Sequence, residues 1–146
     1  MSHRRCSALI VSAALPFMLC GAASAASEVK GTAILDHPCG KVAVKQMGLV
    51  HAGKIEDANK LSTKEMQDEW KAMPAKDRAM MAGMMKGMSQ TDVQFATDIK
   101  ANGLLLVDGQ AATLTVEKKT NDANGTSTST TTQKFKLDGG QCLISR

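Results

Sequence analysis

The chain has 146 residues and a formal net charge of +4, and a chain of this length fits a single domain. Without the first 25 residues, 16 basic side chains remain against 14 acidic ones, a net charge of +2. That remainder has no block of Lys or Arg, and only Trp70, Phe95 and Phe135 could stack on bases. Composition therefore excludes nucleic acid as a partner.

The first 25 residues predict a secretory signal peptide. Arg4 and Arg5 precede an apolar run over residues 8–19, and small residues follow as far as Ala25. The run is shorter than the roughly 20 apolar residues that cross a bilayer, so we expect no transmembrane segment. We expect cleavage near Ala25 and a periplasmic or secreted protein. Cys20 leaves lipid attachment open as an alternative.

Two cysteines follow the signal peptide, Cys39 and Cys142. An exported protein meets an oxidising compartment, so we predict that these two residues form a disulfide. Such a bond would close a loop of about 100 residues and limit the entropy of the unfolded chain. Two free thiols are one alternative. A metal site is another, since His37 stands close to Cys39 in the sequence.

The segment at 28–35 predicts an extended lead-in, and helical periodicity then begins. We predict helices over residues 38–52, 55–61, 63–72 and 75–88. Pro38 suits a first helical turn and Gly53 suits the position just past a helix end. Ser62 and Glu65 have the spacing of a capping box, which predicts the start of the third helix.

Strand patterns dominate from residue 92 onward. Val93, Phe95, Thr97 and Ile99 alternate with polar residues, which predicts a strand. Further strands are predicted over residues 104–107, 112–117, 126–137 and 141–145, with a hairpin turn at Asp108 and Gly109. The Thr-rich run at 126–132 predicts a solvated hairpin or, alternatively, an edge for pairing with another strand.

Helices followed by an antiparallel meander predict an α+β domain over residues 26–146. The helical part, residues 37–88, is expected to pack on one face of the sheet part, residues 92–146. We expect an antiparallel sheet of three to four strands.

The order of elements and two motifs resemble the nuclear transport factor 2-like superfamily, in particular its exported bacterial branch. The first motif comprises residues 52–58 with Leu61, Ser62 and Trp70, and the second comprises residues 138–144. Lys54 stands where an Asp is common, and Cys142 stands near the place of a usual aromatic residue. The resemblance implies a cone-shaped, cystatin-like α+β fold with a pocket between sheet and helices, and homodimers are common in the superfamily. Its members include enzymes and binding domains, so fold alone does not fix the activity.

The segment from residue 80 to residue 88 is rich in methionine. On a helix, Met80, Met81, Met84, Met85 and Met88 form two adjacent stripes. Methionine fills cores and deformable pockets, and its thioether is also a soft ligand suited to copper(I). The stripes therefore predict a pocket lining, a protein-facing surface or a copper site.

We expect the ligand pocket to be lined by residues from this segment and from the sheet part. The predicted lining residues are Met80, Met84, Met88, Phe95 and Leu105. A copper site would instead use Met80, Met81, Met84, Met85 and Met88.

Candidate catalytic groups are few, because the chain has no tyrosine, the proton donor often used by enzymes of this superfamily. The candidates are Asp36, His37, His51, Asp98 and Asp108. Of these, His51 stands near a helix end and Asp108 in a predicted turn, where such residues commonly serve as caps or face solvent. We therefore expect a non-enzymatic binding domain for a small apolar ligand or a protein partner, with no catalytic residue and no cofactor. A copper-handling protein and a small isomerase- or dehydratase-like enzyme, with an acid in the pocket, are the alternatives.

Overall fold

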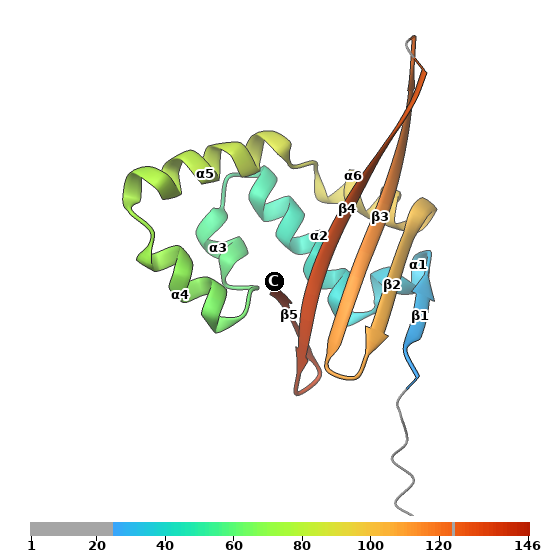
Figure 1. Ribbon diagram of the computed structural model, residues 1–146, viewed down its shortest axis with the longest axis horizontal. Coiled ribbons are helices and arrows are strands. Elements are labelled where there is room, and N and C mark those ends of the chain that lie inside the picture. Colours follow the sequence, from blue (N-terminus) through green and yellow to red (C-terminus); the bar gives the residue numbers. More distant parts are fainter. Residues whose placement is uncertain (1–24, 124) are drawn as a thin grey trace, which may run out of the picture.

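The computed structural model describes residues 25–123 and 125–146 as one short strand, a run of helices and an antiparallel meander (Figure 1). The helical part comprises α1 (Thr32–Asp36), α2 (Pro38–His51), α3 (Ile55–Asn59), α4 (Lys64–Ala72), α5 (Ala75–Met88) and α6 (Asp92–Asn102). The strands are β1 (Ser27–Lys30), β2 (Gly103–Asp108), β3 (Ala111–Asp122), β4 (Gly125–Asp138) and β5 (Gln141–Ser145). The predicted signal peptide and Cys20 lie outside the described residues, apart from Ala25.

The α+β class is confirmed, but the sheet has five strands rather than three to four. Its order is β1-β2-β3-β4-β5, with every neighbouring pair antiparallel. The extra strand comes from the predicted lead-in segment, where Ser27 pairs with Val107 and Lys30 with Leu104. Gly31, at φ 60°, then turns the chain away from the sheet into α1.

The strand predicted over residues 93–99 is wrong, because this segment is the helix α6. Thr91 and Gln94 form a reciprocal capping box, in which each side chain accepts from the other's backbone N–H. Phe95 and Ile99 lie one turn apart and are both buried, whereas Val93 is 71% exposed. The apparent alternation of apolar and polar residues therefore came from Phe95 and Ile99, which share the buried face of the helix, together with the exposed Val93.

The capping box predicted at Ser62 and Glu65 is also wrong. Thr63 is the N-cap of α4 and makes no side-chain cap hydrogen bond. The α3–α4 connection instead pairs with β5: the Ile144 N–H donates to Leu61 O at 2.9 Å, and the Thr63 N–H donates to Ile144 O at 2.8 Å. This pairing buries Ser62 and covers part of the outer edge of β5.

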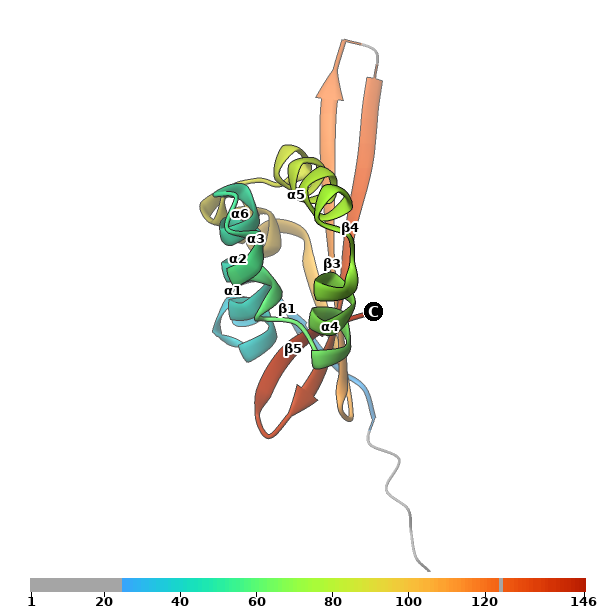
Figure 2. The same cartoon turned by 90° about the vertical axis from the view of Figure 1, so that its left-hand side faces the viewer.

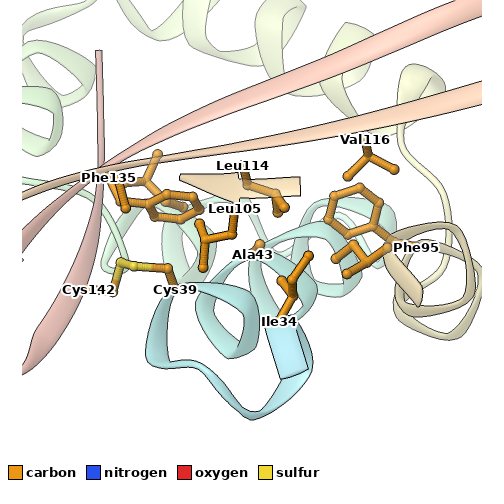
Figure 3. Close-up of a cluster of buried hydrophobic side chains, with 12 residues drawn as sticks. Ile34, Cys39, Ala43, Phe95, Leu105, Leu114, Val116, Phe135 and Cys142 are labelled. Atoms are coloured by element: carbon orange, nitrogen blue, oxygen red, sulfur yellow. A yellow bond between two sulfur atoms is a disulfide. The ribbon is translucent and has the colours of Figure 1, made fainter. Parts of the chain in front are cut away.

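Helices α1, α2 and α6 lie over one face of the sheet, whereas α4 and α5 lie beyond its β5 edge (Figures 1 and 2). The main core fills the space between these three helices and the sheet (Figure 3). Its members with almost no exposed surface are Ile34, Cys39, Ala43, Phe95, Ile99, Leu105, Leu114 and Phe135. No helix among the described residues has both the length and the apolar character needed to cross a membrane.

The predicted disulfide is present between Cys39 and Cys142, whose Cα atoms are 5.0 Å apart (Figure 3). It joins the first turn of α2 to β5 across 103 residues of sequence. Both cysteines are buried in the main core. The bond therefore links the helical layer to the last strand of the sheet within the main core.

The β3–β4 hairpin extends well beyond the rest of the domain (Figure 1). Pairing with β2 ends at Val116, and pairing with β5 ends at Lys134, so the outer parts of β3 and β4 pair only with each other. Residues 125–132 of β4 are exposed, as a solvated hairpin requires. The Thr-rich run thus adds little to the core.

Candidate functional site

A second, smaller apolar cluster lies where α2 meets α3, α4 and α5. Its buried members are Val50, Ile55, Ala58 and Trp70. The Trp70 indole N–H donates to a Glu56 carboxylate oxygen at 3.0 Å, which joins α4 to α3. Unlike the main core, this cluster has no sheet covering it, so its surface is hollowed rather than closed.

Two adjoining pockets open over this cluster. The first, here the tryptophan pocket, has a volume of about 240 Å³ and is lined by Gln46, Ile55, Ala58, Asn59, Ser62, Met66, Glu69, Trp70, Met73, Met81, Met85 and Arg146. The second, here the thioether pocket, has a volume of about 330 Å³ and is lined by Gln46, Met47, Val50, Met81, Met84, Met85, Met88 and Ser89. Because they share Gln46, Met81 and Met85, they form one groove.

Methionine dominates the lining of this groove. Eight methionines follow residue 25, and seven of them line the groove: Met47, Met66, Met73, Met81, Met84, Met85 and Met88. They come from α2, α4 and α5 and from the α4–α5 connection. Met80 lines neither pocket and is 61% exposed. The predicted methionine stripes are therefore one side of a larger apolar surface built by several elements.

Polar groups in the groove are few, and several are already paired. Gln46 accepts a hydrogen bond from the Gln133 side-chain amide at 2.8 Å, which anchors it to β4. Glu69 and Arg146 form an ion pair beside the tryptophan pocket. The thioether pocket contains no charged side chain among its lining residues. The groove therefore offers apolar contact with little unpaired polarity, as a site for an apolar ligand requires.

The structure does not bring the five predicted pocket residues together. Phe95 and Leu105 are buried in the main core, where side chains of α2 and the sheet already fill the space around them. Met84 and Met88 line the thioether pocket, whereas Met80 does not line it and is exposed. The expected pocket between the helices and the sheet is thus replaced by a groove beside the sheet.

The candidate acids and bases lie outside both pockets. Asp36 at the end of α1, His51 at the end of α2 and Asp108 at the end of β2 are exposed. Asp98 accepts a hydrogen bond from Gln90 at 3.0 Å and has Lys118 at 3.8 Å. These are contacts of surface helices and turns, and none of the four lines the groove.

His37 has a structural position as the N-cap of α2. Its Nδ1 accepts a hydrogen bond from the Cys39 N–H at 3.2 Å. Partial burial lowers the pKa of His37, which favours the neutral ring that can accept this bond. Because Cys39 is disulfide-bonded, the alternative of a metal bound by His37 and Cys39 is not supported in the described part of the chain, where no cluster of three His, Cys, Asp or Glu side chains could hold a metal ion.

Sequence reasoning missed the groove residues that come from α2 and α4. Met47 and Val50 of α2 face α5, although their spacing also fits the face that packs on the sheet. Trp70, the only tryptophan of the chain, was the available signal, because a large aromatic residue on an otherwise charged helix marks its packed face. Only the packing of α5 against α2 shows that these residues share one surface.

A comparison of the chain with protein-family models, curated proteins and solved structures finds no match.

Proposed function

We propose that the protein is an exported, non-enzymatic binding domain that holds a small apolar ligand in the methionine-lined groove. The observation that carries this proposal is the convergence of seven methionines and Trp70 on two adjoining pockets. Methionine side chains are unbranched and adapt their shape to what they contact. A groove built from them suits flexible or variable apolar molecules better than a rigidly shaped one.

Size and composition support a small-molecule ligand. Ligand pockets commonly have volumes of about 300–1,000 Å³ and a mostly apolar lining with a few polar groups. The thioether pocket, at about 330 Å³, lies at the lower end of that range and is continued by the tryptophan pocket. Asn59, Ser62 and the Glu69–Arg146 pair supply the polar groups at one end only.

The wider assignment of fold family remains part of the same proposal. Helices followed by an antiparallel sheet agree with the resemblance to the nuclear transport factor 2-like superfamily, and export agrees with the predicted signal peptide and the disulfide. The ligand position proposed here differs from the site that the resemblance implies, because side chains of the main core occupy the space between α2, α6 and the sheet.

Trp70 provides the test, because it is the only tryptophan and lines the tryptophan pocket. We would titrate the protein, in the form that the expressing cell exports, with the neutral apolar dye N-phenyl-1-naphthylamine and follow energy transfer from Trp70. We expect saturable transfer at micromolar dye. Transfer that rises linearly without saturation would contradict the proposal.

Adjacent residues of α5 give a matched pair of variants. Met81 lines both pockets and Met80 lines neither. Met81 is partly exposed, so a glutamine there keeps some hydration, but its amide still disfavours contact with an apolar dye. Met81→Gln should therefore weaken dye binding about fivefold, which corresponds to about 1 kcal/mol. Met80→Gln should leave it unchanged. Equal weakening by both changes would place the dye elsewhere.

A further inference from the structure

The thioether pocket has a composition that apolar binding alone does not require. Five of its eight lining residues are methionines: Met47 from α2, and Met81, Met84, Met85 and Met88 from α5. The other three are Gln46, Val50 and Ser89. Leucine or isoleucine would supply the same apolar surface. The apolar character of the pocket therefore does not explain why all four of its lining residues from α5 are methionines.

Burial does not explain Met84 and Met88, although Met47 and Met85 pack in part against the two apolar clusters. Met84 is 60% exposed and Met88 is 85% exposed, whereas a residue chosen to fill a core gains stability from the surface that it buries. Residues that remain largely in water contribute little to the free energy of unfolding. What they do contribute at this surface is a row of thioether sulfur atoms accessible to a solute.

The helix geometry brings these sulfur atoms to one place. Residues 81, 84, 85 and 88 are separated by three, four and seven positions, which puts them on a single face of α5. Side chains three or four residues apart have Cβ atoms about 5–6 Å apart, and methionine adds three rotatable bonds. Met47 approaches from α2 on the other side of the pocket. Three or more sulfur atoms can therefore reach a common point.

We propose that the thioether pocket is a copper(I) site whose three or more thioether ligands are drawn from Met47, Met81, Met84, Met85 and Met88. Soft thioether ligands select copper(I), and the lining contains no carboxylate or imidazole that would favour a harder cation. Thioethers carry no charge and no proton at ordinary pH. Binding therefore releases no proton, and the affinity is independent of pH between about 4 and 8.

The surroundings of the pocket are compatible with a monovalent cation. Lys86 is the only charged residue between Met80 and Met88, and its side chain runs beside Gly53, just past the end of α2. There its ammonium lies close to the helix C-terminus, which favours positive charge. Lys86 therefore does not line the pocket, and its positive charge lies beside Gly53 instead.

Met80 is excluded from the site, which gives the proposal a built-in control. It is 61% exposed and does not line the pocket, although its spacing from Met84 is the same as that of Met81 from Met85. A site defined by the sequence spacing of α5 alone would include Met80, whereas the site defined by the packing of α5 against α2 replaces it with Met47. If spacing along α5 defines the site, a change at Met80 should weaken copper(I) binding and a change at Met47 should not. If the packing of α5 against α2 defines it, the reverse is expected.

The experiment is an anaerobic titration of the exported protein with copper(I) against the chromophoric chelator bicinchoninate. We expect one ion per chain in the unsubstituted protein. The triple variant M47L/M81L/M85L should bind at least about 100-fold more weakly, since even indirect changes around a metal cost 10–100-fold. M80L should bind as the unsubstituted protein does. No transfer from the chelator, or equal binding by the triple variant, would overturn the proposal.

Silver(I) gives a second measurement that does not depend on the redox state of copper. With ¹³C-methyl-labelled methionine, silver(I) should shift at least three methyl signals among the methionines that line the thioether pocket and leave those of Met66, Met73 and Met80 in place. Shifts confined to Met66 and Met73, or shared by Met80, would contradict the assigned site. Circular dichroism of the triple variant establishes that it is folded.

The result is separable from the proposed apolar ligand. Dye binding and copper(I) transfer are measured independently on the unsubstituted protein, so either can fail alone. A protein that takes up copper(I) but not the dye supports the metal site and contradicts the apolar ligand. A protein that binds the dye but never copper(I) refutes the metal site and leaves the apolar groove standing.

Discussion

The main core and the methionine-lined groove differ in how their side chains are closed off from water. In the main core, helices α1, α2 and α6 cover the sheet, and Phe95, Leu105 and Phe135 are almost fully buried. In the groove, α4 and α5 lie beyond the sheet edge, and Met84 and Met88 are mostly exposed. The comparison indicates that stability is concentrated in the first region and that the second is free to adapt to what it binds.

Phe95 gives the largest expected difference between the two regions. Truncating a buried phenylalanine removes its transfer free energy and leaves a cavity, so Phe95→Ala should lower the free energy of unfolding by about 3–5 kcal/mol. Met84→Ala should change it by less than about 0.5 kcal/mol, because the side chain is largely in water. Urea denaturation of both variants measures the contrast. Similar losses in both would show that the groove is as tightly packed as the core.

The disulfide is expected to have the next largest effect. Replacing both Cys39 and Cys142 by Ala leaves neither partner as an unpaired thiol and removes a link across 103 residues, which should cost about 2–5 kcal/mol. Reducing the unsubstituted protein should lower its stability by a similar amount. If the double variant unfolds at the same urea concentration as the oxidised protein, the link is not what holds α2 to β5.

Trp70 tests how the groove region is held together. Trp70→Phe removes the N–H that donates to Glu56 and keeps an aromatic ring, so we expect a loss of about 1 kcal/mol in the free energy of unfolding. Glu56→Gln keeps an acceptor oxygen and serves as the matched control, with a smaller loss. A larger loss in the control than in Trp70→Phe would mean that Glu56 acts through another contact.

His37 should make a smaller contribution to the free energy of unfolding, and this contribution depends on pH. Burial lowers its pKa in the folded protein below the ordinary 6.5, so the unfolded chain takes up a proton first. The contribution is therefore complete above pH 6.5 and is lost as the pH falls through the lowered folded-state pKa. Urea midpoints between pH 7.5 and 5 should fall more steeply for the unsubstituted protein than for His37→Asn, which keeps a capping side chain that does not titrate.

Four of the six helices and most strands were accessible to sequence reasoning because their signals are local, whereas α1 was expected to be extended and α6 to be a strand. As expected, α2 begins at Pro38 and ends just before Gly53. At Gly53 the backbone takes φ 75°, and the N–H groups of Gly53 and Lys54 donate to carbonyl oxygens of the last helical turn. The hairpin turn after Asp108 is confirmed. The strand expected at 93–99 failed because its alternating pattern also fits a helix with Phe95 and Ile99 on one face.

The candidate site could be predicted only in part. Five methionines between residues 80 and 88 indicated that α5 carries an unusual surface, but the sequence could not say what that surface faces. The sequence predicted Phe95 and Leu105 as pocket residues because an apolar residue that lines a pocket has the same sequence pattern as one that fills the core. Their burial under α2 removes them from any open site.

The sequence by itself determined the ends of α2, the turn after Asp108, the pairing of its two late cysteines and the placement of methionines along one helix, because each depends on neighbours in the chain or on a simple count. Tertiary structure decided that α5 packs beside α2 rather than over the sheet, which set Met47 opposite Met81 and left Met80 in solvent. That choice depends on contacts between residues far apart in the chain, where shape and burial, not local pattern, select the arrangement.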